Sequence, residues 1–277
     1  MFNKFKIKKS QEEVYALIED FVQLVPSTYQ HIGDRESQED AFALSDLMDR
    51  KIVVEKGVLA VVADGMGGLD YGEEASRVAV KVFLRECLTG EEGEPTSERL
   101  YRALLTANAA VFDSAYKDGI EVNLGTTLVA ALVHKRELHW ISVGDSRIYL
   151  FRNKLLMQLN KEHIYQNKLM EEVENGILNM SEAENHPEGS YLTSYLGLPE
   201  LTEVDRSRKP LLIEPGDRVI LSSDGLNNTM STYEIEQFFS SGDQLTAEAL
   251  VNRALEKKQL HQDNITVVIL SCNSYNI

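Results

Sequence analysis

Four short acidic segments between positions 39 and 263 contain the residues best suited to chemistry. They read RESQEDAF with Glu39 and Asp40, VVADGMGG with Asp64, ILSSDGLNN with Asp224, and HQDNITVVIL with Asp263. In the last three, the carboxylate stands where an apolar run meets turn residues, as at the end of a strand. A strand end holds a side chain rigidly, so the pattern favours a fixed cluster of carboxylates.

Carboxylates that gather at strand ends repel one another and resist ionisation unless a cation lies between them. Oxygen ligands without any soft partner suit Mg²⁺ or Mn²⁺. A single Asp-Gly is more often an ordinary turn. Four acidic segments at matching strand ends reverse that preference, and the sequence therefore predicts a metal site.

Composition limits the class of protein. The chain has 277 residues, of which 43% are hydrophobic, enough for a full core in one large domain. With 44 acidic and 28 basic residues the formal charge is −16, which repels a phosphate backbone, so we expect no nucleic-acid partner. Cys87 and Cys272 have no metal spacing and are expected to be reduced, buried thiols.

No leader or membrane span is evident. The lysines of the opening MFNKFKIKKS are not followed by an apolar stretch, and no segment approaches the roughly 18 apolar residues of a transmembrane helix. We expect a cytoplasmic protein without a membrane partner.

The first element that the sequence predicts is a helix over about 11–25. Ser10 and Glu13 form a capping box, and apolar residues follow at helical spacing. Its apolar stripe either packs on the protein's own surface or binds a partner or second copy. The predicted division is therefore 1–25, a basic start with an amphipathic helix, and 26–277, a single domain.

Alternating helices and strands fill that domain. Strands are predicted at 40–44, 58–63, 126–133, 138–143, 147–151, 155–159, 210–213, 218–223 and 265–271, and helices at 73–88, 97–117, 231–239 and 246–257. Tight turns between the short strands indicate antiparallel meanders. The polar, partly helical stretch 165–194 has few apolar anchors, and we interpret it as a flap.

Seven motifs together carry a family resemblance. They are RESQED at 35–40, DGMGG at 64–68, GTT at 125–127, GDSR at 144–147, LTSYLG at 192–197, SSDGL at 222–226 and DNITVV at 263–268. Their order and spacing resemble the metal-dependent serine/threonine protein phosphatases of type 2C, in their bacterial form. The resemblance implies an α+β fold, with a central sandwich of two antiparallel β-sheets flanked by pairs of antiparallel helices.

The resemblance also implies a centre of two Mn²⁺ or Mg²⁺ ions at one end of the sandwich. Asp64 would bridge the ions and the Gly65 carbonyl would be a further ligand. Asp224 and Asp263 would complete one ion, while Glu39 and Asp40 would act largely through waters. A hydroxide between the ions would attack the phosphorus of phosphoserine or phosphothreonine directly.

Three further residues are carried over with the motifs. Arg35 would bind the phosphate, since a guanidinium matches two phosphate oxygens. Asp145 corresponds to the family position for a third, weaker metal, with a hairpin-turn aspartate as the alternative. Asn264 would orient Asp263 without touching the metal. Gly125, Thr126 and Thr127 are interpreted as packing at a strand start.

Met66 stands where some relatives, chiefly eukaryotic, have a histidine assigned as general acid, so the proton donor is open. Two alternatives to an active phosphatase remain. A phosphoprotein-binding pseudophosphatase would lack a metal carboxylate, yet Asp64, Asp224 and Asp263 are present. A partner-switching regulator phosphatase typically lacks the phosphate arginine and has a sensor domain. The expected partners are phosphorylated proteins and a cognate serine/threonine kinase.

Overall fold

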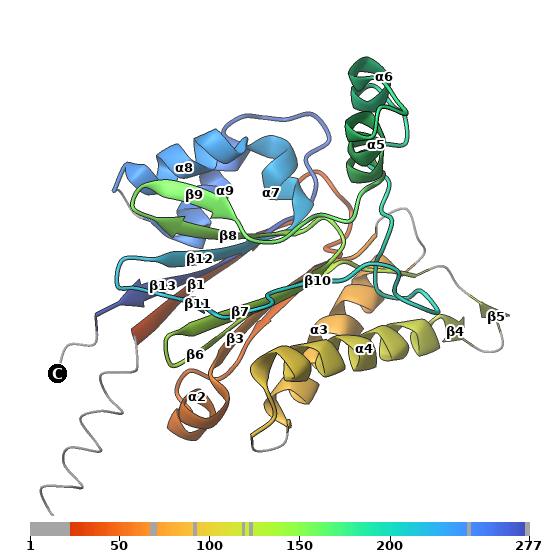
Figure 1. Cartoon of the computed structure of the whole chain (residues 1–277). Coiled ribbons are helices and arrows are strands. Elements are labelled where there is room, and N and C mark those ends of the chain that lie inside the picture. The colour runs from red at the N-terminus through yellow and green to blue at the C-terminus, as the bar shows by residue number, and fades with distance from the viewer. Residues whose placement is uncertain are drawn as a thin grey trace, which may run out of the picture.

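A computed structural model describes residues 23–66, 71–90, 93–117, 120–121, 124–242 and 245–274 of the chain. Two antiparallel sheets form its centre (Figure 1). Sheet A contains, in spatial order, β1 (Gln23–His31), β13 (Ile265–Asn273), β12 (Arg218–Ser222), β8 (Arg147–Arg152) and β9 (Leu155–Gln158). Sheet B contains β10 (Asp205–Arg206), β7 (Glu137–Val143), β6 (Leu128–His134), β3 (Val58–Asp64) and β2 (Asp40–Leu44), and β11 (Leu211–Leu212) also pairs with β7.

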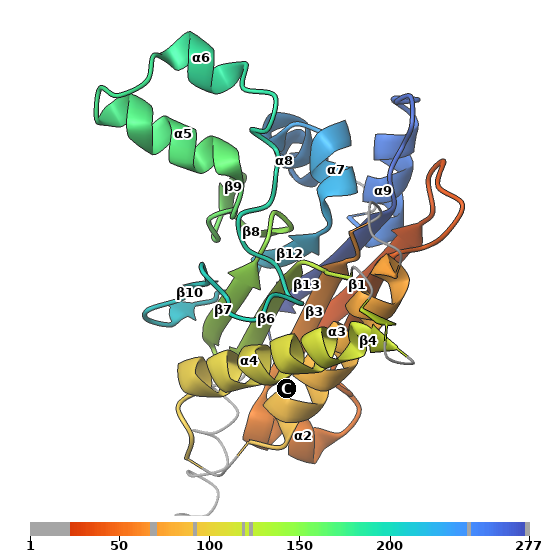
Figure 2. The same ribbon diagram turned by 90° about the vertical axis from the view of Figure 1, so that its right-hand side faces the viewer.

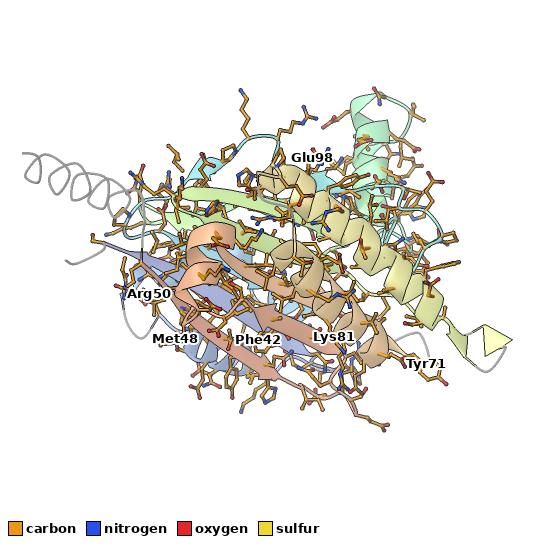
Figure 3. The ribbon with its side chains drawn as sticks, turned by 90° about the horizontal axis from the view of Figure 1, so that it is seen from below. Phe42, Met48, Arg50, Tyr71, Lys81 and Glu98 are labelled. Carbon is orange, nitrogen blue, oxygen red and sulfur yellow. The ribbon has the colours of Figure 1, made fainter. Side chains whose placement is uncertain are left out.

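Helices cover the outer faces of both sheets. On sheet B lie α3 (Gly72–Leu88) and α4 (Thr96–Ser114), and on sheet A lie α8 (Thr232–Ser240) and α9 (Ala247–Leu255). Figure 3 shows α3, with Tyr71 at its start and Lys81 along it, beside the strand that carries Phe42. Shorter elements are α2 (Arg50–Lys56), β4 (Tyr116–Lys117), β5 (Ile120–Glu121) and α7 (Asp224–Thr229). The predicted sandwich with flanking helix pairs is confirmed.

The central strands are apolar throughout because both of their faces are buried. On β3, Val58, Ala60 and Val62 face sheet A, while Leu59 and Val61 face α3 and α4. All five have relative exposures of 4% or less. Truncating a buried side chain of this kind lowers the free energy of unfolding by about 2–5 kcal/mol. The tightly packed sandwich therefore holds the residues at its strand ends in fixed positions.

Strand direction brings the acidic segments to one end of the sandwich. Asp40 begins β2 and pairs with Asp64 at the end of the antiparallel strand β3. In sheet A, β12 runs toward Asp224, and Asp263 stands just before the antiparallel strand β13. The two sheets therefore contribute two acidic segments each, all at the same end.

The stretch 165–194 projects from this end as two helices, α5 (Tyr165–Glu174) and α6 (Met180–Glu184) (Figures 1 and 2). Each helix has a single buried residue, Leu169 and Ala183 respectively. We call residues 165–194 the flap. Few apolar anchors were expected from its sequence, and few are found.

Three local expectations differ from the structure. The predicted helix over 11–25 lies mainly outside the described residues, and its last three positions belong to β1. The helix predicted to reach Lys117 ends at Ser114, and residues 116–117 form β4. The meander is broken, because β7 and β8 belong to different sheets. GDS at 144–146 is thus a crossover between the sheets and not a hairpin turn.

No helix in the described ranges is long and apolar enough to span a bilayer.

Candidate metal centre

Asp64 and Gly65 lie where β3 ends, and neighbouring backbone leaves no room for a side chain at position 65. A Cβ on Gly65 would stand 2.2 Å from the carbonyl oxygen of Gly72 and 2.7 Å from that of Glu39. The Gly65 N–H donates to the same Glu39 carbonyl (3.1 Å). The residues predicted to bind the first metal are thereby locked to the loop that carries Glu39. Gly67 and Gly68 of this motif lie outside the described residues.

Asp40 is buried, with 5% relative exposure, and is bound on one side only. Its Oδ2 accepts hydrogen bonds from Ser223 Oγ (2.8 Å) and Thr266 Oγ1 (2.6 Å), both from sheet A. Its Oδ1 is buried and has no hydrogen-bond partner. Burial, followed by the charge of Asp224, raises the pKa of Asp40 to about 7. An unpaired buried carboxylate oxygen of this kind fits a cation or its water.

Asp64, Asp145 and Asp224 face the same space as Asp40. Burial is the main cause that raises the pKa of each, and for Asp64 the charges of the other three carboxylates add to it. Asp145 reaches about 7, with Asp224 as its second cause. The side chains of Asp64 and Asp224 lie close enough to affect each other's ionisation directly. We call Asp40, Asp64, Asp145 and Asp224 the carboxylate cluster.

Arg35 and Asp263 form an ion pair at the rim of the cluster. Arg35 Nη2 lies 2.7 Å from Asp263 Oδ2, and the side chains are 45% and 34% exposed. This hydrogen bond is the main cause of a raised pKa at Arg35. Glu39 lies nearby, and burial raises its pKa against the opposing effect of Arg35. The predicted phosphate ligand and a predicted metal ligand thus contact each other.

Asn264 connects the loop before β2 to Asp263. Its side chain accepts a hydrogen bond from the Glu39 N–H (2.7 Å) and donates to the carbonyls of Ile32 (2.8 Å) and Ser37 (3.1 Å). Only its backbone N–H reaches Asp263, at Oδ1 (2.8 Å). The side-chain amide therefore fixes the loop that carries Arg35 and Glu39, and the predicted role in orienting Asp263 would rest on the backbone N–H.

Two threonines that the sequence suggested as packing residues hold the metal loop. The Thr126 hydroxyl donates to the Asp64 carbonyl (2.8 Å). Thr127 Oγ1 accepts from the Asp64 N–H (3.0 Å) and lies 2.8 Å from Ser146 Oγ, beside Asp145. The GTT motif was visible in the sequence, but its role depends on strand pairing that only the structure shows.

The residues present fit hard divalent cations. Four partly or fully buried carboxylates meet with raised pKa values. Basic side chains oppose this only weakly, namely Arg147 at Asp145 and Arg35 at Asp224, and both rank after burial. Among the described residues, no group of three or more Asp, Glu, His or Cys side chains is already arranged as a cage for one ion.

Comparisons with known proteins agree on one family. The family model described as "Protein phosphatase 2C" matches residues 28–262. A protein of Listeria innocua named "Serine/threonine phosphatase stp" is 32% identical over 225 residues, which cover 79% of this chain and 86% of that protein.

Solved structures show the same likeness. The serine/threonine phosphatase of S. agalactiae superimposes with a TM-score of 0.74 at 26% identity, covering 90% of this chain and 99% of that one. The catalytic domain of the phosphatase PstP, described in complex with two manganese ions, gives a TM-score of 0.68 at 25% identity, covering 91% and 99%.

Proposed function

The chain belongs to the protein phosphatase 2C family, and from this we propose that the carboxylate cluster, with Glu39, Gly65, Asp263 and Arg35, is its active site. The protein is a bacterial-type serine/threonine protein phosphatase that depends on a divalent metal such as Mn²⁺, and its substrates are phosphorylated proteins. The observation that carries the site assignment is the buried cluster itself, built from both sheets at one end of the sandwich.

In this proposal two ions would be held by Asp64 and the Gly65 carbonyl, with Asp224 and Asp263 as the remaining ligands of one of them. Glu39 and Asp40 would act largely through bound waters, and Asp145 would be a ligand of a third, weaker ion. When bound, the ions stabilise charge on the phosphoryl oxygens and promote ionisation of the attacking water. Mg²⁺ is the second candidate metal, since the same oxygen ligands suit it.

Arg35 binds the phosphate group of the substrate. To do so its guanidinium must exchange Asp263 for the phosphate, which is feasible because both side chains are partly exposed. Asp263 would release the guanidinium when it serves as a metal ligand, since the same carboxylate oxygen now holds Arg35. A bidentate contact then orients the phosphorus toward the cluster.

A cognate serine/threonine kinase, a cytoplasmic location and a single phosphatase domain over 26–277 stay predictions from the sequence. Every carboxylate that a pseudophosphatase would have lost is present, and the described ones lie at the site. A binding function without catalysis is therefore not favoured.

Metal-dependent hydrolysis tests the assignment. We expect purified protein to hydrolyse p-nitrophenyl phosphate and phosphothreonine peptides only with Mn²⁺ or Mg²⁺. Asp224→Asn and Asp263→Asn should lose most activity, by a factor on the order of 10² or more if both ions act on the same step. Asp46→Asn, on the exposed loop at the opposite end of β2, is the matched control and should behave as wild type. Activity that survives exhaustive chelation would refute the proposal.

A further inference from the structure

Three segments far apart in sequence form a small ladder beneath the carboxylate cluster. Residues 64–66 pair with 125–127, and Thr126 pairs in turn with Leu196. The Thr126 N–H donates to the Leu196 carbonyl (3.1 Å), and the Leu196 N–H donates to the Thr126 carbonyl (2.8 Å). The Met66 N–H donates to the Gly125 carbonyl (3.1 Å). Thr126 is thus the middle rung between the metal loop and the chain that leaves the flap.

The hydroxyl of Thr126 strengthens this connection on the metal side. Thr126 is fully buried, with 0% relative exposure. Its Oγ1 lies 2.8 Å from the Asp64 carbonyl and 3.0 Å from the Thr127 carbonyl. The Asp64 carbonyl also accepts from the Thr127 N–H (2.9 Å). Loss of the hydroxyl alone would leave the backbone ladder intact and remove one of the two hydrogen bonds to the Asp64 carbonyl.

The other end of the flap is tied to the second metal loop. The His163 N–H donates to the Gly144 carbonyl (2.9 Å), and the Gly144 N–H donates to His163 Nδ1 (3.1 Å). Gly144 directly precedes Asp145. The two ends of the flap are bonded to each other by Thr193 N–H to the His163 carbonyl (2.8 Å) and by the pairing of Ile164 with Leu192. A displacement of the flap would therefore act on both the Asp64–Gly65 loop and the loop that carries Asp145.

We propose that Thr126 is a positioning residue that couples the flap to the metal affinity of the Asp64–Gly65 loop. The inference rests on the proposed function, since it takes Asp64 and Gly65 as metal ligands. By linkage, a phosphoprotein that engages the flap raises the affinity of the cluster for Mn²⁺, and Mn²⁺ raises the affinity for that phosphoprotein by the same factor. Hydrogen bonds join the end of the flap at Leu196 to Thr126, and Thr126 to the Asp64–Gly65 loop.

The test is a double-mutant cycle with Mn²⁺ affinity as the readout. The first change is Thr126→Val, which keeps the side-chain volume and both backbone bonds to Leu196. The second replaces residues 167–188 by Gly-Gly, a short closure that the Gln166 N–H to Gly189 carbonyl bond (2.7 Å) permits. Calorimetry with Mn²⁺ should show about tenfold weaker binding in Thr126→Val, as for other groups that hold a metal ligand in place.

The coupling appears in the combined variant. Flap replacement should weaken Mn²⁺ binding severalfold in the wild-type background and have a smaller effect in Thr126→Val. Thr126→Ser, which keeps the hydroxyl, should restore both the affinity and the effect of flap replacement. Thr106→Val removes a comparable threonine bond on α4, to the Arg102 carbonyl, and should leave Mn²⁺ affinity unchanged.

Equal fold-changes for flap replacement in both backgrounds would overturn the inference. So would Thr126→Ser binding Mn²⁺ as weakly as Thr126→Val, because the methyl group and not the hydroxyl would then matter. Failure of the proposed function has a separate signature, namely an Asp64→Asn variant whose Mn²⁺ affinity equals that of wild type.

Discussion

Hydroxyl and amide side chains hold each catalytic candidate in place. Ser223 and Thr266 fix one oxygen of Asp40, Thr126 and Thr127 fix the backbone of Asp64, and Asn264 fixes the Glu39 loop. Thr266 lies on β13, and the other four residues lie next to strand ends, each on a segment other than the one that bears the residue it fixes. The cluster is therefore preorganised by strand pairing, and a change of one hydroxyl should act on metal affinity before it acts on chemistry.

Arg35→Ala separates phosphate binding from metal binding. An arginine cannot ligate a cation, so Mn²⁺ affinity should not fall, and the release of Asp263 can only favour the metal. The KM for p-nitrophenyl phosphate should rise about tenfold or more, as expected for the loss of charge-assisted hydrogen bonds. Steady-state kinetics and Mn²⁺ calorimetry measure the two effects. Arg253→Ala, on the exposed surface of α9, is the control, and a collapse of metal affinity in Arg35→Ala would contradict the assigned role.

Met66→His tests whether the enzyme lacks a dedicated general acid. The Met66 side chain folds over Gly125, where a Cβ would stand 2.3 Å from Met66 Cε and 2.8 Å from the Tyr195 ring. A histidine there should raise turnover of alkyl phosphates relative to p-nitrophenyl phosphate, since only the alkoxide needs a proton to leave. The gain should vary with pH near the imidazole pKa of about 6.5.

Met66→Gln is the control, because it has similar length and does not titrate. Rates for both substrates across pH decide the matter. If the ratio of alkyl phosphate turnover to p-nitrophenyl phosphate turnover is the same in wild type, Met66→Gln and Met66→His, a water already supplies the proton.

At the scale of elements, strands and helices with strong periodicity were predictable from sequence, and so were the carboxylates at their ends. Strand β1 was missed because Leu24 and Val25 continue the apolar spacing of the helix predicted before it. The crossover at 144–146 was missed because GDS has the chemistry of a hairpin turn, and only packing against the second sheet distinguishes the two. The hydroxyl network could not be predicted, since each bond joins segments that are distant in sequence.

The flap is suited to selecting protein substrates. It carries the exposed apolar residues Ile177, Met180 and Tyr191, with exposures of 73%, 47% and 62%. Met180 begins α6, whereas Ile177 lies between the two helices and Tyr191 follows the second. Replacement of residues 167–188 by Gly-Gly should lower kcat/KM for a phosphothreonine protein far more than for p-nitrophenyl phosphate, because only the protein reaches the flap.

Both substrates should be assayed at saturating Mn²⁺, so that any change in metal affinity does not contribute. Ile177→Ser with Met180→Ser removes the apolar tip without shortening the chain and should show the same preference more weakly. An equal loss of kcat/KM for both substrates would mean that the flap contributes to the hydrolysis step and not to the choice of substrate.

For the whole molecule, the proposed metal centre lies between the ends of the two sheets. Sheet B supplies Asp40 and Asp64, sheet A leads to Asp224 and Asp263, and Asp145 lies on the crossover between them. Divalent ions held by these groups would connect both sheets. Ligands that bind only the folded state stabilise it in proportion to RT ln(1 + [L]/Kd), so metal binding should raise the free energy of unfolding of the entire sandwich.

The metal-free protein should accordingly lose stability as pH rises. Asp40 and Asp145 have folded-state pKa values of about 7, against about 3.9 for an unfolded aspartate. Below pH 4 both carboxyl groups are protonated in the folded and the unfolded state, so they do not reduce the free energy of unfolding. Between pH 4 and 7 the unfolded chain ionises first, so stability falls until the folded carboxylates ionise as well.

Thermal unfolding with chelator at pH 5 and pH 7.5 measures this loss, which should lower Tm by roughly 5 °C or more at the higher pH, since about 1 kcal/mol shifts Tm by 2–4 °C in a protein of this size. Saturating Mn²⁺ should abolish most of the decline, because the bound ions stabilise the ionised carboxylates. Asp40→Asn should reduce the decline in the metal-free protein, as its amide does not titrate, whereas the exposed control Asp46→Asn should not. A metal-free Tm that is equal at both pH values would show that these carboxylates ionise in the fold as they do in the unfolded chain.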